Sequence, residues 1–175
     1  MNQSYVITGA PGTGKTAIIN ELKERGYCCV DENSREIITE QIKNGGEILP
    51  WKNQIAFENL ISSKRAKQYA SIDKDEVYFF DRSTIDCIAY LKANNLETSA
   101  EILEFIKDCK FNSNVFYTPI WEEIYTTDSE RKESIESAMI IENFLLSTYK
   151  YFDYTLIEIP RLTIEERVDF ILSKI

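Results

Sequence analysis

Short runs of apolar residues alternate along this chain with longer segments in which apolar residues recur every three or four positions. The short runs are typical of strands buried on both faces, and the longer pattern is typical of amphipathic helices. The short runs predict strands at 5–8, 27–30, 77–81, 114–117 and 154–158. The longer segments predict helices at 16–25, 35–42, 52–71, 84–94, 98–106, 134–149 and 163–172. This alternation predicts one α/β domain over residues 1–175, a parallel sheet with helices on both faces.

Two of the predicted helices begin with a capping-box pattern, in which Ser or Thr is followed three positions later by Glu. Thr98 and Glu101 form one such pair, and Thr163 and Glu166 form the other. In the long segment 52–71, the apolar positions that predict the helix are Ile55, Phe57, Leu60 and Ile61, and its basic end carries Lys64, Arg65 and Lys67.

The first predicted strand runs directly into a glycine-rich turn and then into a helix. The turn satisfies the pattern G-x-x-x-x-G-K-[ST] with Gly9, Ala10, Pro11, Gly12, Thr13, Gly14, Lys15 and Thr16. Glycine lets successive backbone N–H groups turn inward as an anion nest, ahead of the positive end of a helix. Lys15 adds a positive charge for the β- and γ-phosphates, and the Thr16 hydroxyl suits Mg²⁺. A chance G-K-T in a glycine-rich turn is the alternative, but the position between strand and helix favours a site for a nucleoside triphosphate.

A second acidic motif follows the predicted strand 77–81, which ends in Asp81. A carboxylate after a buried strand can reach Mg²⁺ directly or through water, as in other P-loop proteins. The alternative is a solvated aspartate at a strand end. Arg82 follows at once; it either clamps a substrate or phosphate oxygen or forms a structural ion pair with Asp31 or Glu32.

The predicted strand 27–30 is also followed by carboxylates, at Asp31 and Glu32. Open α/β sheets assemble their sites at the carboxyl ends of the strands. Glu32 is therefore a candidate general base or acceptor-orienting group, with a surface acid as the alternative. Arg35, one helical turn further on, either binds the acceptor or pairs with Glu32.

Other candidates lie outside the strand ends. Arg131, in the polar stretch after the fourth strand, either closes over the phosphates as a lid or belongs to a solvated helix start. The aromatic residues Trp51, Trp121 and Tyr125 either stack on a base or pack against the protein.

Composition narrows the possible partners. The formal net charge is −9, which argues against nucleic acid or an anionic membrane as a partner. No histidine is present, so neither an imidazole base nor a histidine-bound metal is expected. The four cysteines lack C-x-x-C spacing and are expected to be free thiols rather than zinc ligands or disulfides. No leader-like or membrane-spanning apolar run is found, which predicts a cytoplasmic protein.

At these residues the chain resembles the small kinase-like P-loop NTPases grouped with the ribosylnicotinamide-kinase domain of NAD-biosynthesis regulators, often described only as AAA domain proteins. The resemblance covers nearly the whole chain. Its blocks are Gly9–Thr16, Glu32–Glu36, Gly45–Trp51, Phe79–Ser83 with Asp86, Ala89–Leu91, Trp121–Tyr125 with Asp128, Glu130 and Arg131, Ile159–Pro160, and Glu165–Arg167 leading into Phe170–Leu172.

The resemblance implies a three-layer P-loop NTPase fold with the kinase-like strand order 2-3-1-4-5 and a lid after the fourth strand. It implies phosphate and Mg²⁺ roles for Lys15 and Thr16, a catalytic acid at Asp81, and an acceptor-side pair at Glu32 and Arg35. Asp81-Arg82-Ser83 departs from the ribosylnicotinamide kinases and is similar to the Asp/Glu-Arg-Ser motif of deoxynucleoside kinases, which leaves the acceptor open.

Two functions are compatible with these residues. The first is a phosphotransferase that uses ATP and Mg²⁺ and transfers the γ-phosphate to a small hydroxylated acceptor, a nucleoside or nucleotide. The second is a nucleotide-dependent switch whose slow hydrolysis controls a protein partner. The guanine-reading motif N-K-x-D is absent, which favours ATP over GTP. The oligomeric state is left open.

Overall fold

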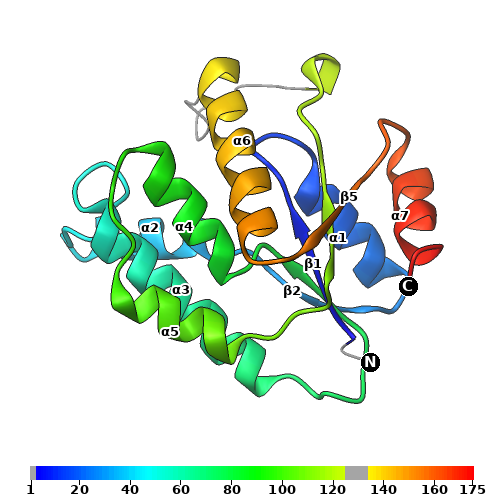
Figure 1. Cartoon of the computed structure of the whole chain (residues 1–175), viewed down its shortest axis with the longest axis horizontal. Coiled ribbons are helices and arrows are strands. Elements are labelled where there is room, and N and C mark those ends of the chain that lie inside the picture. Colours follow the sequence, from blue (N-terminus) through cyan, green and yellow to red (C-terminus); the bar gives the residue numbers. More distant parts are fainter. Residues whose placement is uncertain (1–2, 125–133) are drawn as a thin grey trace.

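The computed structural model describes residues 3–124 and 134–175, which form a parallel sheet between two layers of helices (Figure 1). The strands are β1 (Ser4–Thr8), β2 (Cys28–Val30), β3 (Tyr78–Asp81), β4 (Asn114–Tyr117) and β5 (Thr155–Glu158). The helices are α1 (Lys15–Glu24), α2 (Ser34–Lys43), α3 (Gln54–Ser71), α4 (Thr84–Ala93), α5 (Ala100–Asp108), α6 (Ile135–Tyr151) and α7 (Ile164–Leu172), with a 3-10 turn η1 (Glu122–Ile124). Every strand and helix predicted from the apolar pattern is present.

The strands pair in the order β2-β3-β1-β4-β5, all of them parallel. This confirms the predicted kinase-like topology. β1 lies at the centre, and its Val6 pairs in register with Phe80 on β3 and with Val115 on β4. The middle residues of these strands, Val6, Ile7, Phe79, Phe80, Val115 and Phe116, are buried, as expected for a parallel sheet covered on both faces.

The two faces of the sheet carry separate cores because successive strand residues point to opposite sides. On one face, Ile7, Phe79 and Phe116 pack with residues of α1 and α7. On the other face, Val6, Phe80 and Val115 pack with residues of α3, α4, α5 and α6. Figure 1 shows α1 and α7 side by side at one end of the view, and α3, α4 and α5 gathered at the other.

The carboxyl ends of β1, β2 and β3 meet at one edge of the sheet. Ile7 pairs with Asp81, and Val30 pairs with Phe80. The glycine-rich loop after β1, the carboxylates after β2 and the Asp81-Arg82 pair therefore come together, although Asp81 lies about 50 to 70 positions beyond the others along the chain.

The predicted N-terminal cap is confirmed at one helix and is wrong at another. Thr163 caps α7 in a full capping box with Glu166, as predicted. The prediction of Thr98 as the cap of α5 is wrong, because the neighbouring hydroxyl of Ser99 accepts the N–H of Ile102 at 3.3 Å. Both residues offer the same chemistry, and the path of the backbone selects the second.

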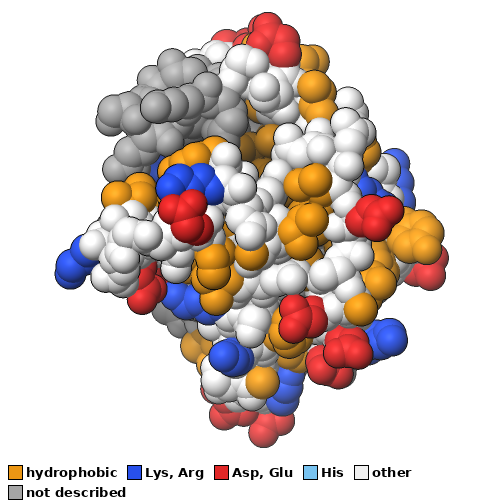
Figure 2. Space-filling model, turned by 90° about the vertical axis from the view of Figure 1, so that its left-hand side faces the viewer, with side chains coloured by type: hydrophobic (Ala, Val, Ile, Leu, Met, Phe, Trp, Pro, Cys, Tyr) orange, Lys and Arg blue, Asp and Glu red, His pale blue; other side chains and the backbone are white. Residues whose placement is uncertain are grey.

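The charges on the surface and the apolar character of the helices are relevant to nucleic-acid and membrane binding. On the side of the molecule drawn in Figure 2, Lys and Arg side chains are interspersed with Asp and Glu over the part that the structure describes. No helix within residues 3–124 and 134–175 combines the length and the apolar character needed to cross a membrane.

Candidate functional site

The loop between β1 and α1 is held in a shape that only glycine adopts readily. Gly9 has φ +148°, and a Cβ on it would lie 2.2 Å from the Thr118 hydroxyl oxygen and 2.6 Å from the Thr118 carbonyl oxygen. The Thr118 hydroxyl also contacts the Thr13 hydroxyl at 2.6 Å and donates to the Thr8 carbonyl at 3.2 Å. Thr118 follows β4, so the strand next to β1 braces the loop from the side.

The loop ends where α1 begins. Gly14 is the N-cap, with φ +86° and no side-chain hydrogen bond capping the helix. The first N–H groups of an α-helix have no partner within the helix, and they carry its positive end. The loop thus presents these donors to an anion, as the predicted phosphate-binding loop requires.

Lys15 is the first residue of α1, and its side chain reaches back to the loop. Its ammonium is buried and donates to the Ala10 carbonyl at 2.7 Å and, more weakly, to the Thr13 hydroxyl at 3.4 Å. Burial, and after it the charge of Arg82, lowers the pKa of Lys15 from 10.5 to about 7, although Asp81 opposes the shift. The negative charge of a bound polyphosphate therefore stabilises the protonated form of Lys15.

Asp81 provides a carboxylate with unused bonding capacity. It is buried at the end of β3, and its Oδ1 has no hydrogen-bond partner in the part of the chain that the structure describes. Burial raises the pKa of Asp81 above its ordinary value, while Lys15 and Arg82 oppose that shift. Thr16, in contrast, is exposed. A carboxylate oxygen and a hydroxyl oxygen are the hard ligands that Mg²⁺ uses together with phosphate oxygens and water, so this donor set fits the predicted metal.

Arg82 is buried, and its Nη1 is bonded to the protein. Its guanidinium donates to the Gly9 carbonyl at 3.1 Å and to Asp86 Oδ1 at 3.2 Å. The predicted alternative of an ion pair with Asp31 or Glu32 therefore named the wrong partner. Asp31 turns outward and pairs with Lys23, whereas Asp86 lies one helical turn beyond Arg82, fully buried at the start of α4.

Asp86 is saturated with donors. The Thr8 hydroxyl lies 2.7 Å from its Oδ1, while the Ser83 N–H at 2.9 Å and the Tyr149 hydroxyl at 2.5 Å donate to its Oδ2. These bonds and the charge of Arg82 outweigh the effect of burial and hold the pKa of Asp86 below its ordinary value. Asp86 thus joins β1, α4 and α6 and fixes Arg82 against the loop.

Glu32 is the half-buried carboxylate of the site. Its Oε1 accepts the Ser34 N–H at 2.9 Å and the Ser34 hydroxyl, and the Arg65 guanidinium lies 3.5 Å away. Burial alone raises the pKa of Glu32, but the charges of Arg82 and Arg65 and the bonds from Ser34 bring it below its ordinary value. Glu32 is thus ionised at neutral pH and is placed beside Asp81, whose pKa it raises.

Arg65 is a site residue that the sequence pattern concealed. In the sequence it stands between Lys64 and Lys67, as one of three residues that make up the basic end of the helix. In the structure Arg65 is buried and donates to the Ser83 carbonyl at 2.7 Å, while Lys64 turns outward to Glu36. An arginine one position from a lysine in a helix faces a different side, and the helical period was the available signal.

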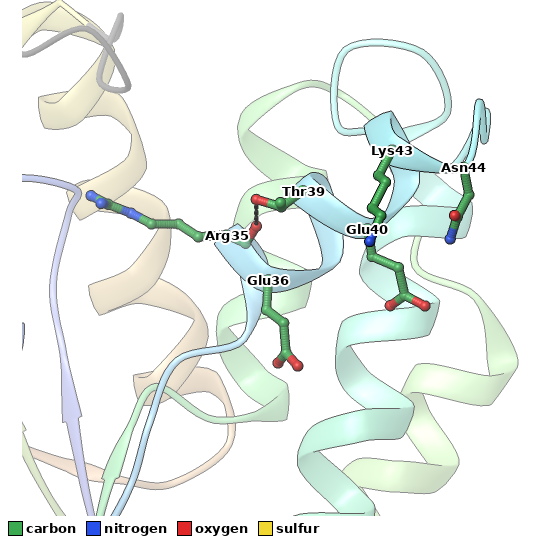
Figure 3. A pocket seen from close by; sticks show the side chains of 6 residues that line it. All are labelled: Arg35, Glu36, Thr39, Glu40, Lys43 and Asn44. Carbon is green, nitrogen blue, oxygen red and sulfur yellow. Dashed lines mark hydrogen bonds between the residues drawn. The ribbon is translucent and has the colours of Figure 1, made fainter.

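Arg35 lies in the first turn of α2 and is exposed. The ion pair of Glu32 is made with Arg65, so the predicted Arg35–Glu32 pair is replaced by another. Figure 3 shows the Arg35 side chain pointing away from the other residues that line a hollow along α2. Those residues are Glu36, Thr39, Glu40, Lys43 and Asn44. All come from one helix and its end, so this hollow is separate from the triphosphate loop.

The two tryptophans differ in their setting. Trp51 is 64% exposed beside a shallow surface hollow lined also by Ile55 and Leu96. Trp121 is half-buried just after β4. Neither ring stacks on another aromatic ring among the described residues. The predicted lid residue Arg131 and the aromatic Tyr125 lie outside the described residues.

Comparison with known proteins agrees with this architecture. A family model described as an AAA domain matches residues 4–167. No curated protein matches the chain in sequence.

Solved structures share the fold at low identity. Deoxyadenosine kinase from M. mycoides with bound dCTP has a TM-score of 0.68 at 19% identity, covering 98% of this chain and 97% of that one. Thymidylate kinase from Candida albicans has a TM-score of 0.68 at 16% identity, covering 99% and 90%. NadR protein in complex with NR has a TM-score of 0.73 at 15% identity, covering 98% of this chain but 51% of that one. By its family match and its strand order, the chain belongs to the AAA domain family and has the fold of a kinase-like P-loop NTPase.

Proposed function

We propose that the chain is a phosphotransferase that moves the γ-phosphoryl group of ATP to the hydroxyl of a small acceptor, a nucleoside or nucleotide. The observation that carries this proposal is the meeting of Lys15, Asp81 and Glu32 at one edge of the sheet. Phosphoryl transfer needs little covalent help from the protein, because positioning and charge neutralisation supply most of the catalysis. The kinase names of the similar structures support the same reaction class.

Each group has a role in the proposal. The loop Gly9–Gly14 and Lys15 hold the β- and γ-phosphates. Thr16 and the unpartnered oxygen of Asp81 hold Mg²⁺, which when bound neutralises charge on the transferred group. Arg82 fixes the loop through its bond to the Gly9 carbonyl and adds positive charge close to Lys15.

Glu32 is the proposed proton acceptor. It is ionised at neutral pH and half-buried next to the phosphate loop, whereas burial biases Asp81 toward the protonated form. The acceptor oxygen forms a bond to the γ-phosphorus as the bond to the bridging oxygen of ADP breaks, and Glu32 takes the proton of the acceptor hydroxyl. Arg35, Trp51 and Trp121 are proposed acceptor contacts, and Arg131 is a proposed lid residue.

The experiment is phosphoryl transfer from γ-labelled ATP with Mg²⁺ to a panel of nucleosides, nucleoside monophosphates and nicotinamide riboside. Labelled product from one acceptor class is the expected result, with Lys15→Ala as the blank. Label that appears only as free phosphate, at the same slow rate with every acceptor, would refute the transferase and favour the nucleotide switch.

A matched pair of variants tests the base. Glu32→Gln keeps the shape but cannot take a proton, and it is expected to lower kcat by about 10²-fold or more. Glu36→Gln is the control, because Glu36 is exposed one helical turn away and pairs with Lys64. Equal kcat in the two variants would remove Glu32 from the proposed role.

A further inference from the structure

Arg167 is a buried arginine that the proposed reaction leaves without a role. It lies on α7, its residue is 2% exposed, and it ends the last block that the sequence resemblance singled out before Phe170. Burying a guanidinium costs several kcal/mol unless its charge is compensated. An arginine kept in such a place therefore calls for an explanation.

The other buried arginines of the described chain are paired with carboxylates. Arg82 pairs with Asp86, and Arg65 lies 3.5 Å from Glu32. Arg167 differs in making no ion pair within residues 3–124 and 134–175, and its Nε, like that of Arg65, has no hydrogen-bond partner there. Burial lowers the pKa of Arg167. Its positive charge is thus uncompensated by the described protein.

The Arg167 guanidinium contacts the phosphate-binding loop from the side of α7. Arg167 donates to the Thr13 carbonyl at 3.1 Å. A Cβ on Gly14 would lie 3.0 Å from its Nη1, so the absence of a side chain at Gly14 is what lets the guanidinium come so close. Arg167 is therefore in contact with the peptide that joins Thr13 to Gly14.

The geometry of that peptide transmits the contact. In a planar trans peptide the C=O and the N–H point in opposite directions. When Arg167 fixes the Thr13 carbonyl, it therefore holds the Gly14 N–H in the opposite direction, away from the guanidinium. A hydrogen bond to a carbonyl also polarises the amide and strengthens its N–H as a donor.

We propose that Arg167 is a positioning residue for the triphosphate: through the Thr13–Gly14 peptide it aims the Gly14 N–H at a phosphate, and its buried charge is balanced when the triphosphate binds. This inference rests on the triphosphate site of the proposed function. It concerns binding alone, so it is tested without any acceptor.

The experiment compares Arg167→Met, Arg167→Lys and Arg25→Met with the unchanged protein. Arg25 is the control because it joins the end of α1 to α7, through Asp169 and the Glu165 carbonyl, whereas Arg167 joins α7 to the loop. The readouts are the Kd for Mg-ATP by calorimetry, its dependence on salt, and the Tm without ligand. Tripolyphosphate serves as a second probe that carries no base.

For Arg167→Met we expect about tenfold weaker binding of both Mg-ATP and tripolyphosphate, and a shallower salt dependence. We expect the Tm without ligand to be kept or raised, because an uncompensated buried charge has been removed. Arg167→Lys is expected to recover part of the affinity and the salt slope, since it keeps the charge. Arg25→Met is expected to lower the Tm and leave the Kd unchanged.

A purely structural role for Arg167 gives the opposite result, a lower Tm without ligand and an unchanged Kd and salt slope, and would overturn the inference. Failure of the unchanged protein to bind Mg-ATP would instead overturn the proposed function. The two failures are therefore distinguishable in one set of titrations.

Discussion

Replacing Asp86 by asparagine tests whether the buried ion pair with Arg82 holds the site together. The substitution keeps the size of the side chain but removes its charge. One end of the amide becomes a donor, and each end of the present carboxylate already faces an N–H: Arg82 at Oδ1 and Ser83 at Oδ2. Whichever way the amide is turned, two donors face each other in a fully buried place.

The magnitude follows from these contacts. Removing one partner of a buried ion pair costs about 3–5 kcal/mol, because the remaining charge stays buried and uncompensated. The amide introduced by Asp86→Asn keeps one acceptor oxygen, so we expect about 3 kcal/mol, at the lower end of that range. For a chain of this size, each kcal/mol lowers the Tm by about 2–4 °C, which gives a decrease of roughly 6–12 °C.

The assay is urea unfolding followed by tryptophan fluorescence and circular dichroism. Asp31→Asn is the matched control, because Asp31 forms an exposed pair with Lys23, and such pairs contribute about 0–1 kcal/mol. The double variant Arg82→Met with Asp86→Asn should be more stable than Asp86→Asn alone, because the orphaned charge is gone. A loss for Asp86→Asn no greater than that for Asp31→Asn would refute the reasoning.

Three further outcomes are expected. The pKa of Lys15 is lowered to about 7, and a bound polyphosphate should raise it again, so Mg-ATP binding at pH 8 should take up a proton and weaken as the pH rises above 7. Calorimetry in buffers of different ionisation enthalpy measures this uptake, and Lys15→Met should show none, because it has no amine to protonate. Burial raises the pKa of Glu58 from 4.5 to about 7, so the folded state holds this proton more tightly, and the free energy of unfolding falls as the pH rises from 4.5 to 7. Glu58→Gln should flatten that pH dependence and stabilise the protein above pH 7 by up to roughly 3 kcal/mol. An unchanged pH profile of stability would contradict the assignment. Gly9→Ala should lose far more stability than Gly26→Ala, because both have positive φ but only Gly9 would meet Thr118; equal losses in urea unfolding would show that the close approach is unimportant.

The sequence predicted the strands and helices well because their signals are local, whereas the strand order was implied by the family resemblance. A strand buried on both faces needs a continuous apolar run, and 114–117 reproduces β4 to the residue. The glycine pattern likewise predicted the loop, since its positive φ values at Gly9 and Gly14 depend on residue type. Even so, two apolar positions that predicted α3 differ in the structure, where Phe57 is buried and Leu60 is 37% exposed. The pattern predicts which face of a helix is apolar, but not how far the neighbouring helices cover that face.

The partners of the charged residues were less predictable because they depend on tertiary packing. Arg82 has φ +74°, a backbone conformation that no local pattern announced, and this turn sets the direction from which its side chain meets Asp86 and Gly9. Arg65 and Arg167 are buried by contacts with residues 18 and 154 positions away. The sequence could name the charged residues but could not assign their partners.

The contact between Arg167 and Thr13 also has a consequence for folding. It closes a loop of 154 positions, and contacts between distant parts of a chain form slowly because the entropy of loop closure must be overcome first. α1 and the glycine turn can form early from neighbouring residues, but their support from α7 waits for almost the whole chain. Competence to hold a triphosphate should therefore appear late in refolding, after most of the helical signal has returned.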